Sequence, residues 1–171
     1  MALTVGTDTY ISVADAKTYA SANHLSTDAK LIAWTALSDT DKEIVLRRAM
    51  QIIENLPIVG VKSVTTQALQ FPRVIYTEVD GQYEYGFAYS AYSHSYIQTS
   101  VPACVGQAQT EIAMQFAVGV SKRLTLQRQG VTQYSIGGLS ETFSKSSLLS
   151  ILSEEAQMLL NPFLATSTGV C

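Results

Sequence analysis

The stretch SDTDKEIVLRRAMQIIENLP, residues 38–57, decides the fold class of this chain. Ser38 is a favoured N-cap residue, and the acidic residues that follow it suit the positive end of a helix dipole. Apolar residues then recur at helical spacing until Pro57 ends the pattern, namely Val45, Ala49, Ile52, Ile53 and Leu56. The stretch therefore predicts an amphipathic helix that buries one face.

A shorter helix is predicted on the N-terminal side of this stretch. Ser12 and Asp15 form a capping-box pattern, and the helix that they begin should end near Asn23-His24. Residues 28–34 predict only one or two loose turns, with Trp34 packing under the next helix.

Two more helices are predicted on the C-terminal side. Pro102 suits the first position of a long helix, whose apolar stripe runs through Val105, Ala108, Ile112, Phe116, Val120 and Leu124. The last helix is expected from Ser146 or Ser147 to Leu160, where Asn161-Pro162 stops it. The chain is thus predicted to be mainly α, a small bundle of about four helices.

Residues 131–144 alternate around Gly137-Gly138 and predict a short β-hairpin. Its apolar members are Tyr134, Ile136, Leu139 and Phe143. A two-stranded hairpin is only marginally stable alone, so we expect it to lean on the helices or on another chain.

Residues 74–100 predict an extended tyrosine-rich insertion. Six of the nine tyrosines fall here, namely Tyr76, Tyr83, Tyr85, Tyr89, Tyr92 and Tyr96, and its charged residues are all acidic. Asp80-Gly81 would allow a hairpin turn. Tyrosine, serine and glycine are typical of protein-binding loops, so we interpret the segment as a protein-contacting insertion, with a solvated loop as the alternative. Just before it, Pro72 favours an extended chain at Phe71, which we expect in the core.

The composition fits one domain, residues 1–160, followed by a tail at 161–171. The chain has 171 residues, of which 47% are hydrophobic and only 15% charged, and its net charge is −3. So low a charge suits permanent contacts with other chains, and the net acidity argues against a dedicated nucleic-acid binder. The sequence has no apolar run long enough to span a membrane and no secretory signal at its start, so we expect synthesis in the cytoplasm.

The sequence lacks a recognisable catalytic pattern. His24 and His94 are its only histidines, and we interpret both as surface or capping residues. Cys104 and Cys171 lack metal-ligand spacing, and Cys104 is interpreted as an inert thiol. We therefore expect no enzymatic activity, no metal and no cofactor.

Lys122, Arg123, Arg128 and Lys145 bracket the predicted hairpin. Cations near a helix C-terminus complement its dipole, which is the simpler explanation. The alternative is a basic face that lies near DNA.

Several segments, in their order along the chain, resemble the small head–tail connector adaptors, or head-completion proteins, of tailed bacteriophages. Relatives of that family are often labelled DnaT-like single-stranded-DNA-binding proteins. The segments are residues 6–16 (GTDTYISVADA), Trp34, residues 41–49 (DKEIVLRRA), residues 67–73 (QALQFPR) and Val101-Pro102. Residues 74–100 depart from the family pattern, which leaves the partner of the insertion open.

The resemblance implies a homo-oligomeric ring, commonly dodecameric, that joins the portal to the neck or tail of the virion and lets DNA pass. It implies portal contacts at Phe163, Leu164 and Val170, contacts between neighbouring subunits at Tyr134, Ile136, Leu139 and Phe143, and a DNA channel lined by Lys122, Arg123 and Arg128. The alternative is a single-stranded-DNA-binding accessory protein of replication.

Overall fold

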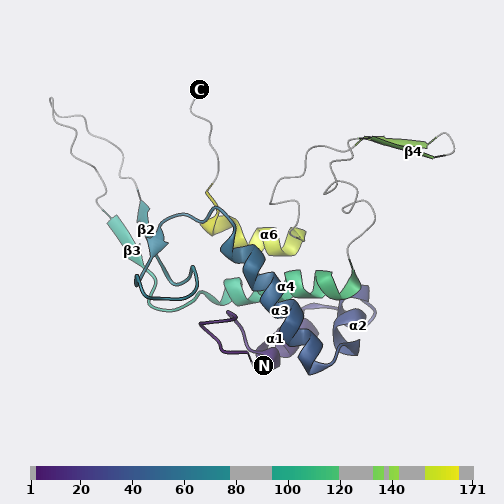
Figure 1. The fold of residues 1–171 in the computed structure, drawn as a ribbon, viewed down its shortest axis with the longest axis horizontal. Coiled ribbons are helices and arrows are strands. Elements are labelled where there is room, and N and C mark those ends of the chain that lie inside the picture. Colours follow the sequence, from purple (N-terminus) through teal and green to yellow (C-terminus); the bar gives the residue numbers. More distant parts are fainter. Residues whose placement is uncertain (1–2, 78–93, 120–132, 137–138, 143–152, 166–171) are drawn as a thin grey trace.

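The computed structural model describes residues 3–77, 94–119, 133–136, 139–142 and 153–165 (Figure 1). Within them the chain forms five α-helices, a 3-10 turn and two small antiparallel sheets, which confirms the mainly α prediction. The helices are α1 (Val13–Asn23), α2 (Ala29–Ala36), α3 (Asp39–Glu54), α4 (Ala103–Val118) and α6 (Glu154–Leu160), with the turn η2 at Asn161–Phe163. None of the described helices is long and apolar enough to cross a lipid bilayer.

Side-chain caps fix where the first helices begin. The Ser12 hydroxyl accepts a hydrogen bond from the Asp15 amide at 3.1 Å and donates to the Asp15 carboxylate at 2.6 Å, and Ser38 and Asp41 repeat both contacts at the start of α3. Both capping predictions are confirmed. The prediction of loose turns at 28–34 is wrong, because Asp28 caps a regular helix, α2, through the Lys30 amide at 2.8 Å.

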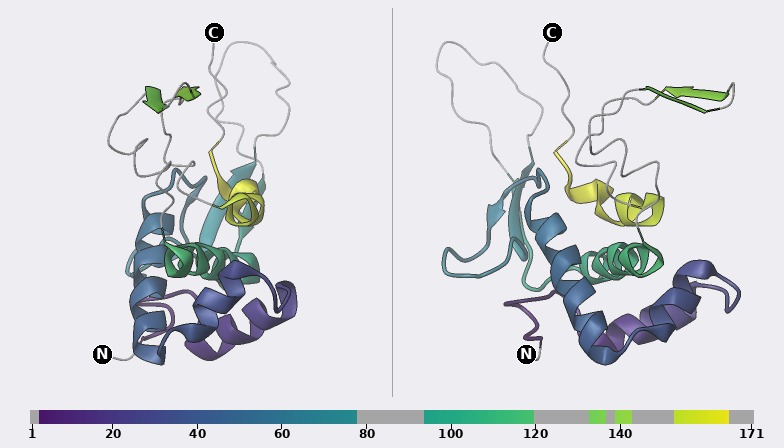
Figure 2. Two further views of the ribbon diagram at one scale, coloured as in Figure 1. Left: turned by 90° about the vertical axis from the view of Figure 1, so that its right-hand side faces the viewer. Right: turned by 45° about the vertical axis from the view of Figure 1, so that its right-hand side comes forward.

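Helix α4 lies at the centre of the molecule, where it contacts α1, α2, α3 and α6 (Figures 1 and 2). Its apolar side chains between Val105 and Met114 are buried, and so is the polar side chain of Gln109. The Gln109 amide donates to the Thr9 hydroxyl and the Leu46 carbonyl, and its oxygen accepts from the Tyr10 amide, each at 2.8 Å. Gln109 therefore joins the N-terminal segment and α3 to the central helix.

Two helix boundaries differ from the predictions. The stripe through Leu124 is interrupted, since α4 ends at Val118 and Gly119 adopts a φ of 92°, outside the helical region. The helix predicted from Ser146 or Ser147 to Leu160 is interrupted at Ser153, which is extended and whose hydroxyl caps the Ala156 amide of α6 at 3.2 Å. A serine followed by acidic residues is a strong signal for a helix start. Residues 146–152 lie outside the described residues.

The larger sheet has the order β1-β2-β3, with strands at Val61–Lys62, Arg73–Thr77 and His94–Ile97. Val74 of β2 pairs with both Val61 and Ile97, and Thr77 pairs with His94. The predicted turn at Asp80-Gly81 lies outside the described residues. The two ends of the tyrosine-rich insertion are neighbouring strands of one sheet.

The segment before β2 packs into the core, as predicted for Phe71. The Phe71 ring packs edge to face against the rings of Tyr10 and Phe163, and the distances between ring centroids are 5.9 and 5.2 Å. The buried Arg73 guanidinium donates to the carbonyl oxygens of Val59 and Ile58, at 2.7 and 3.1 Å, and to that of Gly60. Arg73 thus holds the turn that follows α3 against the sheet.

The first residues of the predicted tail lie against this same turn. The Val59 amide donates to the Phe163 carbonyl, and the Ala165 amide donates to the Pro57 carbonyl, both at 2.8 Å. Leu164 forms a β-bridge with Ile58. Residues 161–165 therefore belong to the folded body.

The predicted hairpin at 131–144 is confirmed for its described part. Strands β4 (Gln133–Ile136) and β5 (Leu139–Thr142) are antiparallel, with Ile136 opposite Leu139. Figures 1 and 2 show this hairpin apart from the helices.

Candidate functional site

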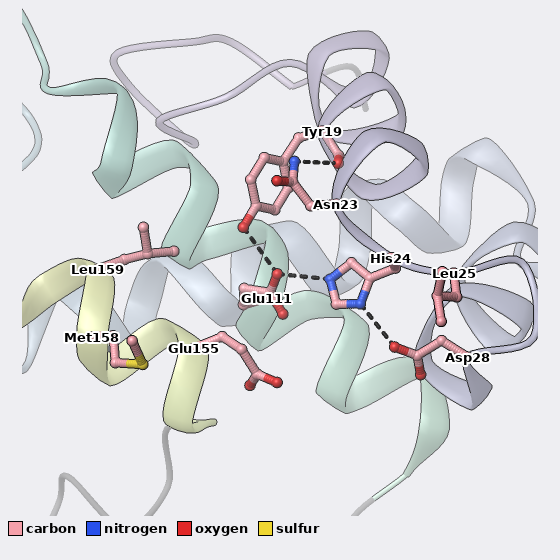
Figure 3. Close-up of a pocket in the computed structure, with 9 residues that line it drawn as sticks. All are labelled: Tyr19, Asn23, His24, Leu25, Asp28, Glu111, Glu155, Met158 and Leu159. Carbon is pink, nitrogen blue, oxygen red and sulfur yellow. Dashed lines mark hydrogen bonds and ion pairs between the residues drawn. The ribbon is translucent and has the colours of Figure 1, made fainter.

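A buried polar cluster joins the junction of α1 and α2 to the central helix (Figure 3). His24 Nε2 lies 2.8 Å from Glu111 Oε1, and His24 Nδ1 lies 2.8 Å from Asp28 Oδ2. The Tyr19 hydroxyl donates to the same Glu111 oxygen at 3.0 Å. Only 8% of the His24 side chain and 2% of the Glu111 side chain are exposed, so these contacts are shielded from water.

Local structure explains why these groups meet. His24 is the C-cap of α1, where its amide donates to the Ala20 carbonyl at 3.1 Å, and Asp28 is the N-cap of α2. The short connection between the two helices places both side chains together. Glu111 comes from the middle of α4, directly opposite this connection (Figure 3).

The cluster favours an ionised arrangement. Burial of the His24 ring lowers its pKa, but hydrogen bonds and the negative charges of Asp28 and Glu111 outweigh burial and raise the pKa above its ordinary value. The hydrogen bond from His24 lowers the pKa of Asp28. Burial, together with the Glu111 charge, raises the pKa of Tyr19, so Tyr19 stays a neutral donor.

The second oxygen of Glu111, Oε2, is buried and has no hydrogen-bond partner among the described residues. Glu111 also lines an open pocket of about 630 Å³. The lining residues are Tyr19, Asn23, His24, Leu25, Asp28, Glu111, Glu155, Met158 and Leu159. A buried carboxylate oxygen with spare acceptor capacity in a pocket wall marks this pocket as the candidate binding site.

One further ion pair borders the pocket. Lys30 of α2 donates to Glu155 of α6 at 2.8 Å, and this hydrogen bond lowers the pKa of Glu155. Three carboxylates, Asp28, Glu111 and Glu155, therefore face two basic groups, Lys30 and His24. The pocket keeps an excess of negative charge even when His24 is protonated.

No group of side chains within the described residues could hold a metal ion. Cys104 lies away from the pocket, and burial raises the pKa of its thiol, which makes it a weaker nucleophile.

The residues singled out from the sequence lie elsewhere. Tyr134, Ile136 and Leu139 belong to the hairpin, Tyr76 and Tyr96 to β2 and β3, and Phe163 and Leu164 to the half-buried segment beside Pro57. The others lie outside the described residues, namely Tyr83, Tyr85, Tyr89, Tyr92, Lys122, Arg123, Arg128, Phe143 and Val170.

Sequence reasoning missed the pocket. His24 was interpreted as a surface or capping residue; it does cap α1, but its ring is buried. One signal was available, because Glu111 is the only charged residue between Pro102 and Ser121. A single carboxylate in an apolar stripe requires buried partners.

Comparison with curated proteins and with solved structures finds no match to this chain. A family model does match, over residues 2–171, and it carries the description "Putative DnaT-like ssDNA binding protein". Because the match spans nearly every residue, the chain belongs to this DnaT-like family.

Proposed function

We propose that this protein is a structural component of a tailed-bacteriophage virion, an adaptor ring that joins the portal to the neck or tail. In this role the ring lets double-stranded DNA pass without gripping it, and it performs no catalysis. The order of sequence segments described above is one support. The observation that carries the proposal is that the described basic side chains already have partners within the molecule.

Of the eleven basic residues, Lys122, Arg123, Arg128 and Lys145 lie outside the described residues, and the other seven each have a partner within the molecule. Lys17 and Lys30 pair with Asp39 and Glu155, and Arg48 lies over the Phe116 ring at 4.5 Å. Lys42, Lys62 and Arg73 donate to backbone carbonyls. The described surface therefore offers phosphates little unpaired positive charge, which fits passage of DNA better than binding.

Apolar surface supports a role in protein assembly. Val61, Val74 and Ile97 are cross-strand neighbours on one face of the larger sheet, and Val61 and Ile97 are 50% and 59% exposed. The β4–β5 hairpin, which lies apart from the helices, is marginal without a partner. We assign Tyr134, Ile136, Leu139 and Phe143 to contacts between subunits on this basis.

The remaining roles follow the same proposal. Phe163, Leu164 and Val170 would contact the portal, and the tyrosines of the insertion would contact another protein of the virion. The anchoring of Ala165 beside Pro57 would fix the point from which the last residues reach the portal. Lys122, Arg123 and Arg128 would line the channel.

The test is electron microscopy and native mass spectrometry of the protein, alone and mixed with its portal. Closed rings, or a defined portal complex, are expected. The variant Ile136→Ser/Leu139→Ser should stay folded and lose assembly, while the matched apolar-to-serine change Val5→Ser, at an exposed residue of the N-terminal segment, should keep it. A protein that is monomeric under both conditions contradicts the proposal.

The description of the family favours a second candidate function, binding of single-stranded DNA. This function requires binding to a labelled oligonucleotide that weakens steeply with salt and loses slope in Lys122→Ala/Arg123→Ala/Arg128→Ala. Binding of this kind, without ring formation, would replace the adaptor proposal. Absence of binding at low salt would exclude the second candidate.

A further inference from the structure

Only one of the two oxygens of the Glu111 carboxylate has a hydrogen-bond partner among the described residues. Its Oε1 accepts from Tyr19 and contacts His24, whereas Oε2 is buried without a partner among the described residues. A charged oxygen removed from water normally has a donor, because an unmade hydrogen bond to a charge is costly. The missing donor can therefore come from a ligand of the pocket.

The charge of the pocket determines the charge of that ligand. Asp28, Glu111 and Glu155 outnumber Lys30 and His24, and Lys30 is already bound to Glu155. An anion would be repelled, and a neutral donor would leave the excess negative charge uncompensated. A cation supplies both a donor and the opposite charge.

The rest of the lining describes the part of the ligand that carries the cation. Leu25 and Met158 are 78% and 77% exposed, and the apolar border of the carboxylates has two parts, Leu25 near Asp28 at one end of the pocket and Met158 with Leu159 on α6 at the other (Figure 3). Little packing holds Leu25 and Met158 in one rotamer, so they can turn to cover an alkyl chain. An aliphatic stem that ends in a cation matches this combination of apolar border and acidic wall.

A guanidinium fits the acidic wall better than an ammonium. It is weakly hydrated, so it loses less when it leaves water for the pocket, and its planar array of N–H donors can reach two carboxylates together. The carboxylate residues Glu111, Asp28 and Glu155 all line the pocket, which suits several donors on one ligand group (Figure 3).

We propose that this pocket binds the arginine side chain of another polypeptide. Free arginine has the same side chain, but its α-carboxylate would face the acidic border, whereas an arginine within a polypeptide has no such charge. This site does not depend on ring formation, and the partner is defined only by an accessible arginine.

The experiment titrates the intact protein with the peptide acetyl-Ala-Arg-Ala-amide and follows amide signals by NMR. A peptide with citrulline in place of arginine is nearly isosteric and neutral, so it tests the need for the positive charge. A lysine peptide tests whether a guanidinium binds better than an ammonium. Free arginine tests whether the arginine must belong to a polypeptide. We expect the arginine peptide to shift signals of Tyr19, His24 and Glu111, with about tenfold weaker binding of the citrulline peptide and weaker binding of the other two. Equal binding of the citrulline, lysine or free-arginine probe overturns the assignment.

Two variants connect binding to the pocket. Glu111→Gln removes the central charge with little change of shape, and Asp28→Asn removes a second charge but keeps a good N-cap residue for α2. Glu154→Gln makes the same change on α6 outside the pocket and should bind like the wild type. Weaker binding is expected in both pocket variants. Should Glu111→Gln fail to fold, Asp28→Asn decides the question, and unchanged affinity in it refutes the proposal.

Discussion

At the scale of single residues, the polar groups inside α4 decide which segments lie against it. Gln109 holds Thr9, Tyr10 and Leu46 through three hydrogen bonds, and Glu111 holds Tyr19 and His24. Both are at most 1% exposed. Buried polar groups are directional, so they select one arrangement of the helices among several that would bury the same apolar area.

Replacement of Gln109 by leucine tests this role. The leucine would leave the buried Tyr10 amide unpaired and would remove the bonds to the Thr9 hydroxyl and the Leu46 carbonyl, so we expect the free energy of unfolding to fall by about 2–3 kcal/mol. Urea denaturation followed by circular dichroism measures the change. Gln51→Leu, at an exposed position of α3, is the control and should change stability by less than about 0.5 kcal/mol. A Gln109→Leu protein as stable as the wild type would contradict the interpretation.

Protonation of His24 should make stability depend on pH. The folded state raises the pKa of His24 above 6.5, so this stabilisation is complete below about pH 6.5 and is lost as the pH rises through the folded-state value. Asp28 acts oppositely: its lowered pKa gives stability that is present above about pH 3.8 and is lost in more acidic solution. Tyr19, Glu111, Lys30 and Glu155 are the other ionisable groups around the pair.

The measurement is the urea midpoint between pH 5.5 and 8.5. In the wild type it should decrease as the pH rises, and His24→Gln should flatten the curve. His94→Gln, which removes the other histidine, should retain the wild-type slope. Identical slopes for the two variants would show that His24 does not carry the effect.

Prediction from sequence succeeded for residues whose signal is local. The acidic residue three positions after Ser12 and after Ser38 indicates that each serine caps a helix, and both serines do. The proline after Phe71 favours an extended chain there, and Phe71 is buried. His24 and Glu111 gave no comparable signal, since they are 87 residues apart in the chain. Their meeting depends on how α1, α2 and α4 pack, which no short window of sequence contains.

At the scale of elements, the junction between α3 and the sheet is the most constrained part of the described fold. Gly60 has a φ of 80°, and a Cβ at this position would collide with the Val74 carbonyl oxygen of β2. Arg73 fixes the same turn by donating to the carbonyls of residues 58–60. A side chain at position 60 would therefore disturb both the turn and the β1–β2 pairing.

The variants Gly60→Ala and Gly6→Ala separate the two causes of strain. Gly6 has a similar φ of 86°, but nothing lies within 4 Å of its would-be Cβ. We expect Gly6→Ala to cost about 1 kcal/mol, from backbone conformation alone, and Gly60→Ala to cost about 3 kcal/mol or more. Thermal and urea unfolding give both values. Equal losses would show that the contact with Val74 is unimportant.

Element boundaries were harder to predict than element types. The apolar stripe of α4 continues in the sequence beyond Val118, yet Gly119 leaves the helical region, and the extended Ser153 interrupts the helix predicted from Ser146 to Leu160. Apolar periodicity does not show where a cap or a glycine ends a helix. The pairing of β2 with β3 was missed because residues 78–93 separate the two strands in the sequence.

At the scale of the whole molecule, we predict that the folded body does not need residues 78–93. Thr77 and His94 are cross-strand partners, so a short turn could join them directly. Deletion of residues 78–96 would remove most of β3, whereas replacement of residues 78–93 leaves both strands complete. The body should then fold without the tyrosines at 83, 85, 89 and 92.

Replacement of residues 78–93 by Asn-Gly tests this separation. The unfolding temperature should stay within about 3 °C of the wild type, because every described contact of the body is retained. Assembly, measured by native mass spectrometry, should be impaired if the segment binds another protein. In a second variant, a glycine-serine segment of the original length replaces residues 78–93, which controls for the shorter connection between β2 and β3. An unfolded Asn-Gly variant would place residues 78–93 in the core.

The contacts of residues 161–165 with residues 57–59 have a consequence for biosynthesis. The ribosome releases α3 and Phe71 long before Phe163, although the Phe163 ring covers Phe71 and its carbonyl binds Val59. The growing chain must therefore keep an aromatic core residue partly uncovered until residues 161–165 have been synthesised. Chains that terminate before residue 161 should therefore expose part of their interior and be recognised by chaperones and proteases.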